Sequence, residues 1–204
     1  MARGAVILAG GRSTRFGERD KATAPLGDQP LVRHVLERVA PVVDAVTINC
    51  RAAQQAAIAD AIGPWRSSVQ FATDPEEDRG PVMGIAVGLA ATETDHCAVV
   101  ACDMPFVDPL LLRYLFVAIG DADAILPRPD AWYVPTQAVY NREGVLESMQ
   151  TVADAGDERI LAALADRDVI TVDAPVLDRL DAHASLQNIN TQSELAAAAD
   201  ALGQ

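Results

Sequence analysis

Short runs of apolar and β-branched residues alternate along the chain with longer stretches in which apolar residues recur every three to four positions. The short runs are AVILA (5–9), AVTIN (45–49), VQFA (69–72) and CAVVA (97–101). The longer stretches span 30–43, 52–62, 82–93 and 108–121. Continuous apolar runs are typical of strands buried on both faces, and the longer spacing is typical of helices. This order predicts an α/β sandwich with a mostly parallel sheet.

The alternation of strand-like and helix-like segments changes after Ala122, where two strand-like segments, ADAILP (122–127) and WYVPTQAVY (132–140), follow one another closely. Two strands so close in sequence predict an antiparallel part of the sheet in the C-terminal half. Before them, Asp108 is a natural N-cap, Pro109 suits the first helical position and Gly120 follows the helix. We find no linker and no repeat, so we expect a single domain over residues 1–204.

The stretch AGGRSTRFGERDK (9–21) places adjacent glycines and several cations directly after the first predicted strand. Gly10 and Gly11 let backbone N–H groups approach an oxyanion, and Arg15 and Lys21 are among the cations that can neutralise it. Lys21 is also the only lysine in the sequence. The spacing matches neither the P-loop nor the dinucleotide-binding fingerprint. We therefore expect a different phosphate-binding loop at the carboxyl end of this strand.

Three further motifs lie beyond predicted strands or before the last helix. Asp103 in CDMPF (102–106) follows a buried strand, where a carboxylate can hold Mg²⁺ or cap a helix, and we expect the metal. Asp74 and Gly84 in TDPEEDRGPVMGI (73–85) suit the edge of a guanine base and the close approach of a nucleotide. In NINTQSEL (188–195), Thr191 and Glu194 form a capping box. That motif leaves the amides of Asn188 and Asn190 for a second substrate.

The charge excludes one class of partner and favours a particular setting. The formal net charge is -13, with 29 acidic and 16 basic residues, so we expect no binding to nucleic acid. An acidic surface can simply keep a protein soluble, but we favour a saline cytosol, in which salt screens the self-repulsion. Three cysteines without metal spacing indicate reduced thiols. With no signal peptide and no membrane span in the pattern, we expect a cytoplasmic protein.

Four motifs together carry a resemblance to a known family. LAGGRSTRFGERDKATAPL (8–26), RGPVMGI (79–85), CDMPF and NINTQSEL resemble the motifs of the molybdenum cofactor guanylyltransferases over nearly the whole chain. The resemblance implies a three-layer Rossmann-like nucleotidyltransferase fold with a partly antiparallel sheet. It also implies an enzyme that transfers GMP from GTP to the phosphate of Mo-molybdopterin and releases pyrophosphate. Molybdopterin-carrying proteins or apo-molybdoenzymes would then be transient partners.

The resemblance also implies roles for individual residues. The expected GTP-binding residues are Leu8, Ala9, Gly10, Gly11, Arg15, Lys21, Asn49, Asp74, Gly84 and Asp103. Arg15, Lys21 and Asp103 would be catalytic, and Asp103 would also hold Mg²⁺. Asn188 and Asn190 would bind the acceptor. The asparagine that this family has after its second strand corresponds to either Asn49 or Cys50, and we carry Asn49 as the candidate.

Two alternatives stay open at this point. One is a related nucleotidyltransferase: a molybdopterin cytidylyltransferase, or a guanylyltransferase for cobinamide phosphate or a sugar phosphate. The other is a nucleotide-binding regulator without turnover, against which the intact Lys21 and Asp103 argue.

Overall fold

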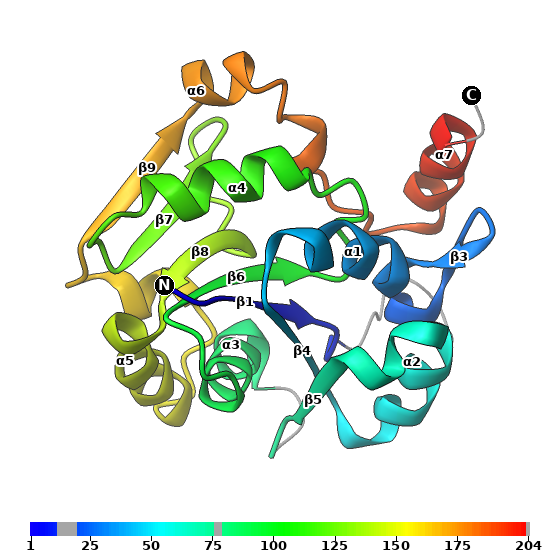
Figure 1. Ribbon diagram of the computed structural model, residues 1–204, viewed down its shortest axis with the longest axis horizontal. Coiled ribbons are helices and arrows are strands. Elements are labelled where there is room, and N and C mark those ends of the chain that lie inside the picture. Colours follow the sequence, from blue (N-terminus) through cyan, green and yellow to red (C-terminus); the bar gives the residue numbers. More distant parts are fainter. Residues whose placement is uncertain (12–19, 76–78, 203–204) are drawn as a thin grey trace.

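A central sheet lies between two layers of helices in the computed structural model, which describes residues 1–11, 20–75 and 79–202 (Figure 1). Within these residues, seven strands pair in the order β5-β4-β1-β6-β8-β7-β9. Their bounds are β1 Arg3–Leu8, β4 Ala45–Cys50, β5 Val69–Thr73, β6 His96–Ala101, β7 Ala124–Arg128, β8 Gln137–Asn141 and β9 Val169–Asp173. A two-strand hairpin stands apart, with β2 at Pro25–Leu26 and β3 at Gln29–Pro30. The predicted α/β fold is confirmed.

The sheet is parallel except at β8. β1 runs parallel to β4 and β6, and β4 runs parallel to β5. β8 runs antiparallel to β6 and β7, which confirms the antiparallel part expected in the C-terminal half. The strand predicted over 132–140 begins only at Gln137. Pro135 has no N–H to donate to a ladder, and its carbonyl instead accepts from the buried Tyr140 hydroxyl at 2.7 Å.

The two helical layers follow from the alternation of side chains along the strands. Ala5 and Ile7 point into one core, with α1 (Leu31–Val39), α2 (Gln55–Ala61), α4 (Pro109–Ala118) and α6 (Ala174–Arg179). Val6 points to the other face, covered by α3 (Gly80–Ala91) and α5 (Arg142–Asp154) (Figure 1). Both faces of β1, β4 and β6 are therefore buried, as their continuous apolar sequence requires. The edge strand β5 was also predicted to be buried, but its Gln70 and Thr73 are exposed.

Local sequence signals set the ends of α4. The Asp108 side chain accepts from the Leu110 N–H at 2.7 Å, and Pro109 is the first helical residue. Gly120 follows the helix with φ at +54°, a conformation that a Cβ would strain. These positions match the expected cap, first turn and stop. Within the described ranges, none of the helices is both long enough and apolar enough to span a bilayer.

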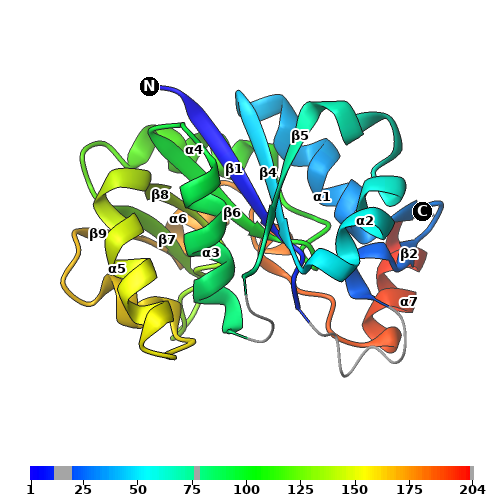
Figure 2. The same cartoon turned by 90° about the horizontal axis from the view of Figure 1, so that it is seen from below.

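The last helix returns the end of the chain to the hairpin near its beginning. α7 (Gln192–Leu202) lies beside β2, as the second view shows (Figure 2). The buried Ala198 of α7 belongs to a small core together with Leu26 of β2 and Leu31 of α1. This packing places residues 188–191, which lead into α7, close to the first turn after residue 20. Segments that are far apart in sequence thus meet at one edge of the sheet.

Candidate active site

The carboxyl ends of β1, β4, β5 and β6 form one edge of the sheet, and backbone hydrogen bonds continue the strand pairing a little beyond it. The Ala9 N–H donates to the Asn49 carbonyl at 2.8 Å, and the Cys102 N–H donates to the Leu8 carbonyl at 3.0 Å. The Asp74 N–H donates to the Cys50 carbonyl at 3.1 Å. This edge therefore holds Ala9, Asn49, Asp74 and the start of the turn at Asp103 in a fixed relation. Ligands bind at this edge of open α/β sheets.

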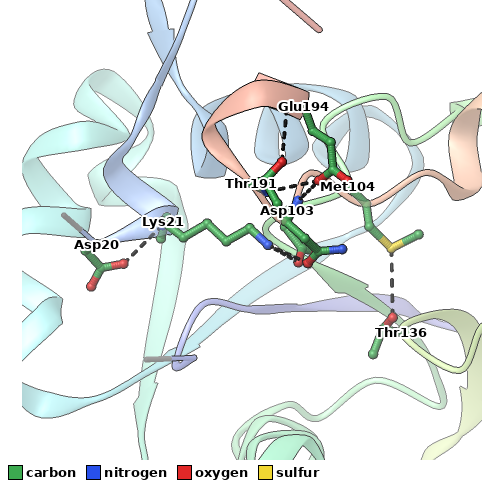
Figure 3. Close-up of polar contacts among 9 residues, drawn as sticks. Asp20, Lys21, Asp103, Met104, Thr136, Thr191 and Glu194 are labelled. Carbon is green, nitrogen blue, oxygen red and sulfur yellow. Dashed lines mark hydrogen bonds and ion pairs between the residues drawn. The ribbon is translucent and has the colours of Figure 1, made fainter. Parts of the chain in front are cut away.

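Three predicted residues from distant parts of the chain meet in one ionic contact. The Lys21 ammonium lies 2.6 Å from Asp103 Oδ2 and donates to Asn190 Oδ1 at 3.0 Å (Figure 3). The side chains of Lys21 and Asp103 are only 13% and 18% exposed. A pair with so little exposure is screened less by solvent than a surface pair. We name Lys21, Asp103 and Asn190 the ionic centre.

The lysine is presented by a short turn. Lys21–Thr23 form a 3-10 helix that Asp20 caps, since its Oδ1 accepts from the Ala22 N–H at 3.0 Å. The turn therefore begins at the lysine itself, directly after the capping residue. Arg15, the other predicted catalytic cation, lies outside the described residues, as do Arg12 and Arg19.

Asp103 is held by its backbone and keeps one carboxylate oxygen buried. Its carbonyl accepts from the Ile189 N–H at 2.8 Å, which joins the turn after β6 to the segment before α7. Its Oδ1 is buried, and none of the described residues donates a hydrogen bond to it. Asp103 does not cap α4, because Asp108 does. A carboxylate oxygen that no described residue occupies can coordinate a cation.

The residues fit Mg²⁺ better than a metal enclosed by protein ligands. Within the described ranges, no group of three or more His, Cys, Asp or Glu side chains is placed to enclose a metal ion. Mg²⁺ is usually held by one or two carboxylates together with substrate phosphates and water. A single carboxylate oxygen at Asp103 matches that pattern.

The segment before α7 contains the predicted capping box. The Glu194 N–H donates to Thr191 Oγ1 at 3.1 Å, and Glu194 Oε2 accepts from the N–H groups of Thr191 and Asn190 (Figure 3). These bonds, first of all that from Asn190, hold the pKa of Glu194 below its usual value. Asn188 and Asn190 are both exposed on either side of the buried Ile189. Of the two asparagines, Asn190 contacts Lys21, and Asn188 lies two residues before it.

A second carboxylate lies at the ends of β4 and β5 in a different environment. Asn49 Nδ2 donates to Asp74 Oδ1 at 2.7 Å, and Asn49 is only 2% exposed. Burial raises the pKa of Asp74, while the hydrogen bond from Asn49 and the charge of Arg51 oppose that rise. We name Asn49 and Asp74 the amide centre.

The amide centre also explains two glycines. A Cβ on Gly84 would lie 2.5 Å from Asn49 Oδ1, and one on Gly10 would lie 2.8 Å from Asp74 Oδ2. Either contact would push the polar side chains out of place. Cys50 points to the opposite face of β4, into the core of α1 and α2, where burial raises its pKa to about 12. Asn49, and not Cys50, therefore faces this edge.

Gln54 was not predicted, although it contacts both ends of the glycine stretch. It ends the 3-10 helix Ala52–Gln54 and is 5% exposed. Its Nε2 donates to the Ala9 carbonyl at 3.2 Å and to Asp20 Oδ2. The sequence contained a signal for it, because residues 54, 58 and 62 follow one another at intervals of four, and Ile58 and Ile62 are apolar and buried.

A pocket of about 530 Å³ opens near the same edge. Its lining includes Pro81 at the start of α3, Pro135 before β8 and residues 158–162. β8 runs antiparallel, so its first residues lie at the carboxyl ends of the neighbouring strands. The Ala101 N–H, at the end of β6, donates to the Thr136 carbonyl at 2.9 Å, which places this wall beside the turn that carries Asp103.

Comparison with known proteins shows which family the chain resembles in sequence and in fold. The family model described as the MobA-like NTP transferase domain matches residues 5–169. A probable molybdenum cofactor guanylyltransferase from Natronomonas pharaonis is 40% identical, with 97% of this chain and 96% of that protein covered. One from Haloferax mediterranei is 36% identical, with 96% and 92% covered. The crystal structure of molybdopterin-guanine dinucleotide biosynthesis protein A from Archaeoglobus fulgidus has a TM-score of 0.82 at 27% identity, with 98% of each chain covered. By its matched residues and its full-length relatives, the chain belongs to the nucleotidyltransferases of the MobA-like NTP transferase family.

Proposed function

We propose that this enzyme transfers GMP from GTP to the phosphate of Mo-molybdopterin, forming the guanine dinucleotide cofactor and releasing pyrophosphate. The names of its full-length relatives support this activity. The observation that carries the proposal is the ionic centre, where Lys21 meets Asp103 and Asn190 at the edge of the sheet. A nucleotidyl transfer needs a cation beside the phosphates and a carboxylate for the metal, and both are in contact here.

Lys21 would stabilise the charge that moves during the reaction. An oxygen of the acceptor phosphate forms a bond to the α-phosphorus of GTP, while the bond from that phosphorus to the pyrophosphate oxygen breaks. The electron pair leaves with pyrophosphate, and Lys21 and Arg15 would neutralise the developing charge. The ammonium lies beside Asp103, so its charge would act next to the proposed metal ligand.

No general base is required for this reaction, because the attacking phosphate is already ionised at neutral pH. The histidines fit that expectation. His34 contacts the Leu26 carbonyl, and His183 contacts Asp178. His96 begins β6, at the opposite end of the strand from Asp103, and burial lowers its pKa.

Mg²⁺ would be held by Asp103, whose buried Oδ1 supports a cation there. When bound, Mg²⁺ would neutralise phosphate oxygens and orient the transferred group.

Guanine would be selected at the amide centre. The Asp74 carboxylate can accept from the two N–H groups on the guanine edge, which cytosine and adenine do not present in that arrangement. Asn49 fixes one Asp74 oxygen by its hydrogen bond, and the approach of Gly10 keeps the other close to the expected nucleotide-binding backbone. Leu8, Ala9, Gly10, Gly11 and Gly84 would complete the nucleotide site.

The acceptor would bind on the other side of the ionic centre. Asn190 already lies beside Lys21, and Asn188 is exposed on the same segment. The pocket lined by Pro81, Pro135 and residues 158–162 offers apolar space for a ring system. Molybdopterin-carrying proteins or apo-molybdoenzymes would supply the acceptor or receive the product.

We place this activity in the cytoplasm, in a setting of high salt. GTP is a cytoplasmic substrate, and the described cysteines, Cys50, Cys97 and Cys102, are buried free thiols that suit a reducing compartment. The net charge of -13 suits high salt, since screening weakens self-repulsion. Stability and activity should then rise as KCl is increased toward the molar range. Full stability and activity at about 0.1 M KCl would refute the saline setting.

The function is tested by incubating the purified protein with Mo-molybdopterin, Mg²⁺ and each of GTP, CTP, ATP and UTP. GTP should give the guanine dinucleotide cofactor and stoichiometric pyrophosphate, with the other nucleotides far slower. Transfer from CTP at the same rate as from GTP would instead indicate a nucleotidyltransferase of broad specificity that also acts as a cytidylyltransferase. Nucleotide binding without pyrophosphate release would indicate a regulator without turnover.

A further inference from the structure

Gln54 uses its whole side-chain amide to join three parts of the chain. Its Oε1 accepts from the backbone N–H and from Nε of Arg51, both at 3.0 Å. Its Nε2 donates to the Ala9 carbonyl at 3.2 Å and to Asp20 Oδ2. A primary amide has two donor hydrogens and an oxygen that accepts twice. The 5%-exposed Gln54 is therefore fully satisfied by these four contacts.

The two groups that accept from Gln54 immediately precede residues expected to bind the nucleotide. Ala9 precedes Gly10, and its N–H is already bonded to the Asn49 carbonyl at 2.8 Å. Asp20 precedes Lys21 and caps the turn that begins with it. Ala9 directly follows β1, whereas Lys21 contacts Asp103, which follows β6. The amide of Gln54 thus connects the end of β1 to the turn that presents the lysine.

We propose that Gln54 is a positioning residue, which holds Asp20 and thereby fixes Lys21 relative to the nucleotide-binding end of β1. This inference rests on the proposed guanylyl transfer, because Lys21 is the group whose position matters. Gln54 contacts no reacting atom and acts through Asp20. Gln54 donates to the Ala9 carbonyl and the Asp20 carboxylate and accepts from two N–H groups of Arg51. Only an amide can do both, since a carboxylate has no N–H and an ammonium cannot accept. Small misplacements of a reacting group cost up to about a hundredfold in rate.

The test is Gln54→Glu, which keeps the shape of the side chain and removes both donors. The new carboxylate faces the Ala9 carbonyl and the Asp20 carboxylate, so Asp20 and Lys21 should shift. We expect kcat for guanylyl transfer to fall on the order of a hundredfold. Gln55→Glu makes the same substitution at the exposed neighbouring position and should leave kcat unchanged.

A polarity swap separates positioning from mere stability. Asp20→Asn alone sets two amide donors against each other, whereas Gln54→Glu combined with Asp20→Asn restores one donor facing one acceptor. The kcat of the double variant should be at least about tenfold higher than that of Gln54→Glu alone. Such coupling is expected only of groups in direct contact. If Gln54→Glu does not fold, as judged by circular dichroism and melting temperature, Gln54→Met carries the same test without the added charge.

The outcomes distinguish this inference from the proposed function. If the unsubstituted protein makes no guanine dinucleotide, the proposed function is wrong, and the role of Gln54 in that reaction falls with it. If the unsubstituted protein is active and folded Gln54→Glu has the same kcat as Gln55→Glu, Gln54 has no positioning role. A double variant no faster than Gln54→Glu also overturns the proposal.

Discussion

Two carboxylates, Asp103 and Asp74, lie at the same edge of the sheet but have different neighbours. Asp103 faces the ammonium of Lys21 at 2.6 Å, and its other oxygen is buried with no donor among the described residues. Asp74 faces the neutral amide of Asn49 at 2.7 Å, and burial raises its pKa. A carboxylate beside a cation suits charge and metal, whereas one beside an amide suits the N–H groups of a base. In the proposed function, the surroundings of the two carboxylates, and not their residue type, would assign one to catalysis and the other to base recognition.

The largest expected effect comes from neutralising Asp103. Asp103→Asn removes the partner of Lys21 and the proposed metal ligand together, so we expect single-turnover guanylyl transfer to fall on the order of a thousandfold. Asp60→Asn is the matched control, because Asp60 is an 80%-exposed carboxylate on α2. An equal loss of activity in both variants would show that the carboxylate of Asp103 has no specific role in the transfer.

The next effect tests whether the ionic centre needs a compact ammonium. Lys21 fits between Asp103 and Asn190 at 2.6 and 3.0 Å, whereas a guanidinium is larger and planar. Lys21→Arg should therefore lose roughly a hundredfold in rate, about 3 kcal/mol in the transition state, almost as much as Lys21→Ala. GTP affinity, measured by calorimetry, should fall less. Near-normal turnover of Lys21→Arg would show that any cation serves.

A smaller effect should appear at the amide centre. Asp74→Ala removes the proposed acceptor for guanine, so the preference for GTP over CTP should fall by at least about tenfold. Thermal shifts with the two nucleotides measure this preference, and transfer at saturating GTP should persist. A preference that survives the substitution would place guanine recognition elsewhere.

The smallest effect concerns stability and pH. A raised pKa means that folding favours the protonated Asp74, so its contribution is present below the unfolded pKa of about 3.9 and is lost as pH rises through the folded pKa. Asp74→Asn, which stays neutral, should gain stability relative to the unsubstituted protein as pH rises from 3 to 7. Urea unfolding at pH 3 and pH 7 checks this. If Asp74→Asn were instead more stabilised at pH 3 than at pH 7, the pKa of Asp74 would be lowered and not raised by folding.

Local signals explain how much of this molecule its sequence predicts. Continuous apolar runs indicated the parallel strands, and the cap at Asp108 and the capping box of Thr191 and Glu194 were confirmed as predicted. Such patterns depend on neighbours within a few residues. The contact of Lys21 with Asn190 spans 169 positions and depends on the packing of α7 against β2.

The unpredicted parts depend on tertiary contacts or on a choice between equivalent residues. Gln54 and Gln55 are identical neighbours in sequence. The spacing to Ile58 favours burial of the first, but the contacts of Gln54 with Ala9 and Asp20 depend on the tertiary fold. Asn49 and Cys50 were both candidates for the family's asparagine position, and only the fold shows that Asn49 contacts Asp74 whereas Cys50 lies in the core on the opposite face of β4. The arginines of residues 12–19 lie outside the described residues, so the role of Arg15 stays a prediction.

One measurement tests the division between the two carboxylates most directly. Transfer of GMP or CMP to Mo-molybdopterin is followed at saturating GTP or CTP for the unsubstituted protein, Asp103→Asn and Asp74→Ala. We predict that Asp103→Asn slows transfer of both GMP and CMP and leaves the ratio of the GMP rate to the CMP rate unchanged. Asp74→Ala should lower that ratio while transfer of GMP continues. Loss of the GTP preference in Asp103→Asn, or loss of all transfer in folded Asp74→Ala, would contradict this account.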